Sequence, residues 1–162
     1  MTEGDQVVEA SGTKSSVSLV IPCKPEYVAL GRLVAGSLGS GQGWPEEVIA
    51  DLKVVVSETT SLFVASDETA PVAETTGAAE PPSAPLALDI DVGPLGWTLT
   101  VSRTQVMLEI APESGLGLTY ERALALTIVQ ALVDNWEKTD DPVLGTVLRV
   151  SKSLTDHAGA ED

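Results

Sequence analysis

The most constraining feature of the sequence is a long run of apolar residues at helical spacing between Pro45 and Ser66. Pro45 followed by two acidic residues is typical of a helix start, because proline fits the first turn and acids favour the positive end of the helix dipole. Apolar side chains then recur every three or four residues. They are Val48, Leu52, Val55, Thr59 and Leu62, widened by Ile49, Val56 and Phe63. A helix with so broad an apolar face must bury it against other elements.

Strand patterns lie on both sides of this helix, at 17–21, 86–92, 97–101, 106–110 and 145–151. The segment 17–21 is rich in β-branched residues, and 86–92 alternates strictly between apolar and polar side chains. Gly93 to Gly96 predicts a turn that joins 86–92 to a returning strand. These segments predict one sheet with at least one hairpin.

Two further helices are predicted. One begins at Pro25 and stops at the glycine-rich segment 39–43, and the other runs from Thr119 to Lys138, before a break at 140–142. Their expected apolar stripes are Tyr27, Leu30, Val34 and Leu38 in the first, and Leu124, Ile128, Leu132 and Trp136 in the second. The order of elements predicts an α+β fold, a two-layer sandwich of a mixed β-sheet with helices on one face.

The 162 residues suit one domain, which we expect at 17–153. Residues 1–16 are polar and small, and 154–162 are polar and acidic, so both are expected to be disordered tails. The segment 67–85 has four prolines, four acids and no Lys or Arg, which predicts a flexible acidic loop within the domain.

Charge and composition exclude several classes of function. With 9 basic and 24 acidic residues the formal net charge is −15, which disfavours direct binding to nucleic acid or to a membrane and permits a basic protein partner. Cys23 is the sole cysteine, so an internal disulfide is excluded. The sole histidine, His157, lies in the polar C-terminal tail, so we expect neither a zinc site rich in His and Cys nor a histidine-based triad. Cys23 is expected to be a buried filler. The lack of a signal peptide or a spanning apolar run predicts a cytoplasmic protein.

Three segments stand in the order found in a known family: 21–28 with Arg32 and Leu33 after it, 51–58, and 115–118 before a helix ending at Asp134. Together, over about residues 17–152, they resemble the bacterial anti-sigma-factor serine kinases of the general-stress and sporulation type. The resemblance implies a histidine-kinase-like ATPase (Bergerat) fold and a homodimer. It also implies that the protein holds a sigma factor inactive and phosphorylates a serine on a small anti-anti-sigma (STAS-type) partner.

In that fold one helix carries a glutamate as general base and, four residues later, an asparagine that binds Mg²⁺, so that both groups lie on one helical face. Glu58 stands at the first position, but the second is Leu62, which has no oxygen for a hard cation. Because Leu62 continues the apolar row of its helix, it is expected to fill space. We therefore predict no metal ligand in this chain.

The family's adenine-binding Asp-x-Gly-x-Gly segment is also missing. The nearest candidate, 91–96, has one residue too many and contains a proline, so a hairpin turn explains it better. Of the site only Glu58, Gly115 and Gly117 remain. Glu58 is either a general base or an ordinary solvated helix residue. The two glycines either cradle phosphate or form the first turn of the following helix. We expect weak or absent binding of ATP, with ATP and Mg²⁺ as cofactors only if the site functions.

These observations favour a partner-switching regulator that binds a sigma factor, an anti-anti-sigma protein, or both. Two alternatives stay open: an active Mg-ATP-dependent serine kinase with Glu58 as base, and a pseudo-ATPase subunit for dimerisation or scaffolding. The segment from Val54 to Ser102 holds seven acids and no Lys or Arg, which favours a basic protein surface over nucleotide phosphates as its partner.

Overall fold

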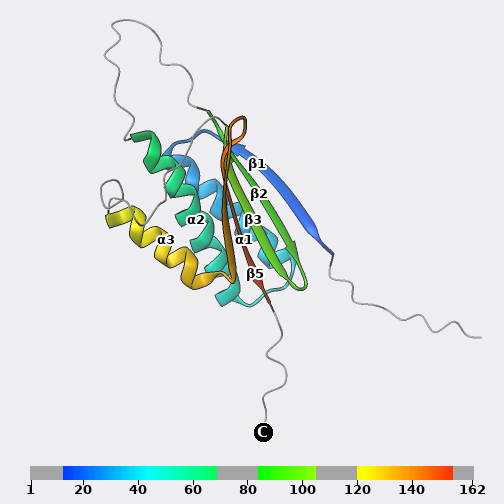
Figure 1. Cartoon of the computed structure of the whole chain (residues 1–162). Coiled ribbons are helices and arrows are strands. Elements are labelled where there is room, and N and C mark those ends of the chain that lie inside the picture. The colour runs from blue at the N-terminus through cyan, green and yellow to red at the C-terminus, as the bar shows by residue number, and fades with distance from the viewer. Residues whose placement is uncertain (1–12, 69–83, 105–119, 155–162) are drawn as a thin grey trace, which may run out of the picture.

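A computed structural model describes residues 13–68, 84–104 and 120–154. The described residues form an α+β protein, in which paired strands and helices follow one another along the chain (Figure 1). The elements are β1 (Ser15–Ile21), the short 3₁₀ helix η1 (Pro25–Tyr27), α1 (Val28–Gly41), α2 (Glu46–Glu68), β2 (Leu86–Gly93), β3 (Gly96–Arg103), α3 (Tyr120–Leu132), β4 (Asn135–Asp141) and β5 (Gly145–Ser153). No described helix has the length and apolar character needed to cross a membrane.

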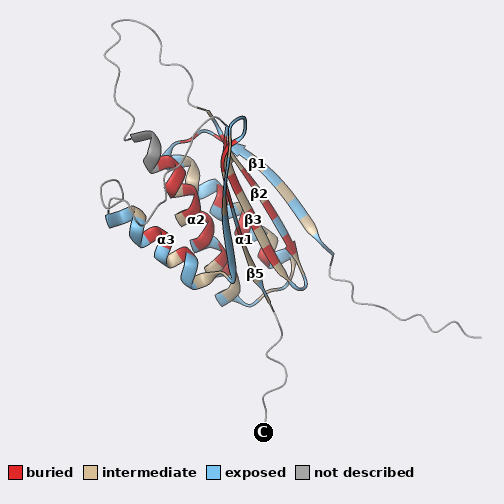
Figure 2. Ribbon diagram, viewed as in Figure 1, coloured by how far each residue is buried: buried red, intermediate tan, exposed pale blue. Residues whose placement is uncertain are grey.

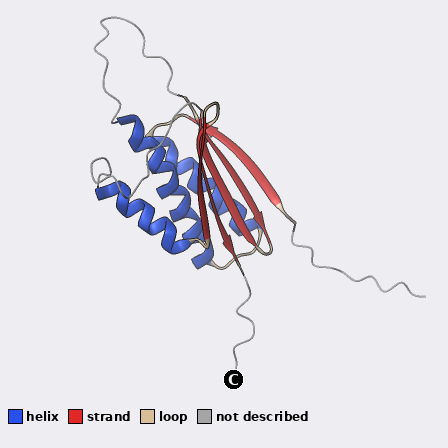
Figure 3. Ribbon diagram, in the orientation of Figure 1, coloured by secondary structure: helices blue, strands red, loops and turns tan. Residues whose placement is uncertain are grey.

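The described strands form one sheet in the order β1-β2-β3-β5-β4, and the three α-helices cover one of its faces (Figure 3). The predicted two-layer sandwich is confirmed. Every pairing is antiparallel, where the sequence predicted a mixed sheet. The reason lies in the connections, because α1 and α2 together return the chain to the end where β1 finished. The strand that follows them, β2, therefore runs opposite to β1.

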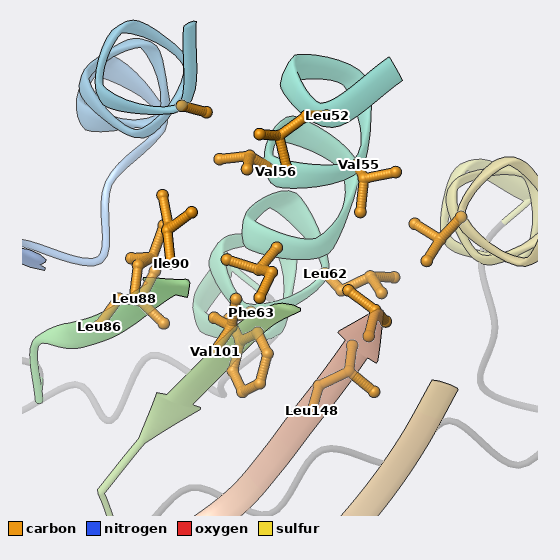
Figure 4. Close-up of a cluster of buried hydrophobic side chains, with 14 of the residues drawn as sticks. Leu52, Val55, Val56, Leu62, Phe63, Leu86, Leu88, Ile90, Val101 and Leu148 are labelled. Carbon is orange, nitrogen blue, oxygen red and sulfur yellow. The ribbon is translucent and has the colours of Figure 1, made fainter. Parts of the chain in front are cut away.

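The core lies between α2 and the inner face of the sheet (Figures 2 and 4). The predicted apolar face of α2 is confirmed, because its residues are buried or half-buried as expected. The fully buried side chains of α2 are Leu52, Val55, Val56, Leu62 and Phe63, and those of the strands opposite are Leu86, Leu88, Ile90, Leu99, Val101 and Leu148. Cys23 is buried beside them, and its Sγ lies 3.6 Å from the carbonyl oxygen of Phe63, so the prediction of a buried filler is also confirmed.

The buried face of α1 differs from the prediction. Its buried residues are small, namely Gly31, Ala35, Gly36 and Gly39, whereas Leu30 of the predicted stripe is 41% exposed. A Cβ on Gly31 would lie 3.0 Å from Cγ1 of Val56 and 3.2 Å from a methyl of Leu88. The helix thus packs so closely on α2 and the sheet that large side chains are displaced to its flanks.

The third helix is shorter than predicted. It ends at Leu132, and 135–141 forms strand β4 instead of a further turn of helix. Pairing with β5 decides this: the backbone N–H of Asp134 donates to the Ser151 carbonyl at 3.0 Å, and the Asp134 carboxylate accepts from the Ser153 N–H at 2.7 Å. The predicted stripe is therefore wrong at Leu124, which is 47% exposed, and at Trp136, which lies in β4. The buried residues of α3 are Ala125, Leu126 and Val129.

The remaining predictions divide into two groups. The strands near 17–21, 86–92, 97–101 and 145–151 are confirmed, as is the hairpin turn at 93–96. Gly96 has a φ of +149°, and a Cβ there would meet the Lys152 carbonyl oxygen, so the turn requires glycine. The strand predicted at 106–110, the glycines at 115 and 117, most of the acidic segment 67–85 and most of both tails lie outside the described residues.

Candidate functional site

Glu58 lies on the outer face of α2, at an open groove beside α1. The groove has a volume of about 540 Å³ and is lined by Ala29, Arg32 and Leu33 from α1 and by Ala50, Lys53, Val54, Ser57 and Glu58 from α2. A second hollow of about 600 Å³ shares Arg32, Ser57 and Glu58 and continues towards η1. The two hollows form one surface, which we call the α1–α2 groove.

Glu58 is half-buried and forms no hydrogen bond or ion pair with another described residue. Its carboxylate therefore stands at the surface of the groove, accessible to a partner molecule. The structure thus leaves both alternatives for Glu58 in place, because a general base and a solvated helix residue would each stand at such a surface.

The side chain four residues after Glu58 is buried. Leu62 is 1% exposed, and it projects from α2 towards α3 among the buried side chains (Figure 4). The prediction that Leu62 fills space is confirmed by this burial. Its backbone carbonyl accepts a hydrogen bond of 3.3 Å from the guanidinium of Arg122 on α3, which holds the two helices together at this level. Where the family fold would need an oxygen ligand, this chain has a packed hydrocarbon side chain.

The described residues cover part of the nucleotide site that the resemblance implies. Leu62 supplies no ligand for Mg²⁺, and no three Cys, His, Asp or Glu side chains gather as a metal site within the described residues. Gly115 and Gly117 lie outside the described residues, so their predicted contact with phosphate is not tested. The segment 91–96, the nearest candidate for an adenine loop, is the β2–β3 hairpin.

Two cations lie in the groove, and the sequence analysis did not single them out as site residues. Arg32 and Lys53 form no ion pair with another described residue. The side chain of Lys53 lies flat across α1, because its Cε is 2.5 Å from the place where a Cβ of residue 36 would stand. Glycine at 36 thus makes room for the lysine stem. The tertiary packing of α1 on α2 brings these cations together with Leu33 and Val54, and no local motif signals it.

The carboxylates with perturbed acidity lie elsewhere, in the β4–β5 hairpin. Hydrogen bonds from the Thr146 hydroxyl at 2.7 Å and from the Lys138 ammonium at 3.0 Å lower the pKa of Asp140. Backbone N–H groups of Leu144 and Val143 lower the pKa of Asp141. Both carboxylates stabilise the turn in their charged form, so we assign them a structural role.

Part of the chain is similar to known proteins. The serine-protein kinases RsbW of Listeria monocytogenes and of Listeria innocua are each 50% identical to this chain over 42 residues. A quarter of the chain is therefore related to these kinases. The match covers 26% of this chain and 27% of each relative, so it spans about a quarter of their length. No family model matches the chain.

Proposed function

We propose that this chain is a partner-switching regulator of the anti-sigma type, acting in the bacterial cytoplasm without efficient binding of ATP. The observation that carries the proposal is the identity of 50% over 42 residues to serine-protein kinases RsbW. The partners we propose are a sigma factor, a STAS-type anti-anti-sigma protein, or both. The net charge of −15 supports a partner with a basic surface.

The α1–α2 groove supports the binding half of the proposal. It sets exposed apolar side chains, Leu33 at 69% and Val54 at 39%, beside charged groups without ion-pair partners among the described residues. Apolar centres with a charged rim are typical of protein interfaces. The buried leucine at position 62 supports the second part of the proposal, the lack of efficient ATP binding. It leaves Mg²⁺ without the side-chain oxygen that the family fold uses.

The binding test is co-purification of the tagged chain with each sigma factor and each STAS-type protein of the same cell. We expect a stable complex with at least one of them. Leu33→Asp should weaken that complex, whereas Leu95→Asp, an equal change at the 81% exposed tip of the β2–β3 turn, should leave it intact. A chain that forms no complex with any of these proteins would contradict the proposal.

The nucleotide test is a calorimetric titration with Mg-ATP, because the likeness to kinases and the accessible Glu58 favour an active kinase as the second candidate. We expect no tight binding by the natural chain. Tight, magnesium-dependent binding that is followed by phosphorylation of a STAS-type protein and lost in Glu58→Gln would establish the kinase instead. Leu62→Asn supplies the missing oxygen, and Leu62→Ala controls for the lost packing, with circular dichroism to show that each variant is folded.

A further inference from the structure

Strand β4 lies at one end of the sheet. Among the described strands it has a single neighbour, β5, so its other side presents a free row of backbone N–H and C=O groups (Figure 1). An extended segment of another protein can pair with such a row and add a strand to the sheet. Main-chain hydrogen bonds then supply affinity, and the side chains along the edge decide which segment fits. The side chains of β4 therefore indicate what kind of segment the edge accepts.

The face of β4 that points away from the helices is acidic. Glu137 is exposed there, and it forms no ion pair with Arg149, which stands opposite it in β5, or with another described residue. Asp141 is on the same face, about 13 Å further along the strand. Its carboxylate accepts hydrogen bonds from the backbone N–H groups of Val143 and Leu144, which lower its pKa and keep it charged. Two negative charges thus border the free edge on this face.

The opposite face of β4, on the helix side, presents a tryptophan. Trp136 is 39% exposed, whereas Val150, which stands opposite it in β5, is 1% exposed. Trp136 therefore continues a buried apolar row out to the edge, where no described strand covers it. The charge of Lys138 on the same face is offset by Asp140, with its Nζ 3.0 Å from the carboxylate. An apolar side chain beside Trp136 in an added strand would extend the row, and such aromatic pairs stabilise sheets.

We propose that the free edge of β4 binds an extended basic segment of a partner protein as an added strand. Lys or Arg side chains at alternate positions of that segment face Glu137 and Asp141, and the apolar residues between them lie on the side of Trp136. This inference does not rest on the proposed function, because the α1–α2 groove takes no part in it.

Charge selects a basic segment over a second copy of this chain. Strand β4 has three acids and one lysine, a net charge of −2, so two such edges repel each other. The net charge of −15 acts in the same direction, because it repels a second copy and attracts a basic protein. Charged side chains commonly protect a free edge against pairing with its own kind. The same acids are complementary to a basic strand, so they disfavour one occupant and favour the other.

The test compares two synthetic peptides of equal charge by isothermal titration calorimetry. The first is Lys-Val-Lys-Val-Lys-Val-Lys with blocked ends, and the second has proline in place of two of its valines, which removes donors that strand pairing needs. We expect saturable binding of the first peptide to the natural chain, with a dissociation constant at least about tenfold lower than that of the second. No binding of the first peptide would overturn the proposal. Equal binding of both would also overturn it, since it would show attraction by charge alone.

Variants on the outer face of the sheet show whether β4 is the strand that binds. Glu137→Lys should weaken binding of the valine peptide at least about tenfold, because it replaces attraction at the edge by repulsion. Asp91→Lys is the matched control, since Asp91 is exposed on the same face but in β2, with β3 and β5 between it and β4. It should weaken binding by less than about threefold. Circular dichroism shows whether each variant is folded, and equal weakening by the two would contradict binding at β4.

Two further measurements on the natural chain test the strand pairing itself. Binding of the valine peptide should shift tryptophan emission to shorter wavelength, because the added strand shields Trp136, and Trp136→Phe should lose the shift. In hydrogen exchange, amides of β4 should exchange more slowly with the peptide bound, while those of β1 should not change. Protection of β1 instead of β4, or an emission shift that persists in Trp136→Phe, would overturn the proposal. Protection of β4 by protein concentration alone would make a second copy the occupant and would overturn it as well.

Discussion

The two faces of helix α2 show how one element can serve two purposes. Towards the sheet it buries Leu52, Val56 and Phe63 completely, whereas on the opposite side Lys53, Val54 and Glu58 line an open groove. The inner face is specified by a regular apolar period and by close packing, and the outer face is free of both constraints. A change on the inner face should therefore alter stability, and a change on the outer face should alter binding alone.

The largest effect is expected at the centre of the inner face. Phe63→Ala should lower the free energy of unfolding by about 4 kcal/mol, because Phe63 is fully buried and its loss leaves a cavity between α2 and the sheet. Urea denaturation measures the change. Val54→Ala is the control in the same helix and should shift the free energy by less than about 0.5 kcal/mol. Comparable losses in the two variants would show that the two faces of α2 do not differ as described.

The contact between α1 and α2 can be tested with two glycines of the same helix. Gly39→Ala should destabilise the protein by about 2 kcal/mol, because the new Cβ would lie 2.8 Å from Cγ1 of Ile49 on α2. Gly41→Ala, where nothing lies within 4 Å, should stabilise it by about 0.5 kcal/mol through the lower entropy of the unfolded chain. Thermal unfolding of both variants shows whether each substitution raises or lowers the stability of the protein. Changes of stability in the same direction would contradict the close approach of α1 to α2.

Two neighbouring threonines of α2, Thr59 and Thr60, test the effect of buried hydroxyl groups on stability. Both are fully buried, but the Thr60 hydroxyl donates to the Val56 carbonyl at 2.6 Å, whereas the Thr59 hydroxyl has no hydrogen-bond partner among the described residues. Thr59→Val should therefore raise the free energy of unfolding by about 1 kcal/mol. Thr60→Val should lower it by up to about 1 kcal/mol. Chemical denaturation measures the free energy of unfolding of both variants. A destabilised Thr59→Val variant would mean that the Thr59 hydroxyl forms a hydrogen bond in solution.

The smallest effect is expected on the outer face. Glu58→Gln should change the free energy of unfolding by less than about 0.5 kcal/mol, because the carboxylate has no hydrogen-bond or ion-pair partner among the described residues. Urea denaturation measures this change in the free energy of unfolding as well. A clear loss of stability would give Glu58 a structural role, and the contrast between the two faces of α2 would then fail at this residue.

Much of the fold could be predicted where local pattern and tertiary packing agree. The apolar period of α2 and the alternation of β2 each contain enough residues to define which face is buried, and both are confirmed. The extension of α3 to Lys138 is wrong because Leu132 and Trp136 continue a helical spacing that pairing with β5 overrides. The stripe of α1 is wrong at Leu30 because a close helix contact selects glycine and alanine, which carry no hydrophobic pattern.

The sequence predicted which side chains stand at positions 58 and 62 of one helix, but it did not predict which residues surround them in the fold. The sequence determined that position 62 offers Mg²⁺ no oxygen and that Glu58 stands on the same helix, because side-chain chemistry and helical spacing are local properties. The tertiary structure alone decided that Leu62 packs towards α3, that Arg32 and Lys53 meet in one groove, and that β1 lies at an edge of the sheet that the described strands form. Those facts depend on which elements become neighbours, and residues far apart in the chain set the order of strands and the packing of helices.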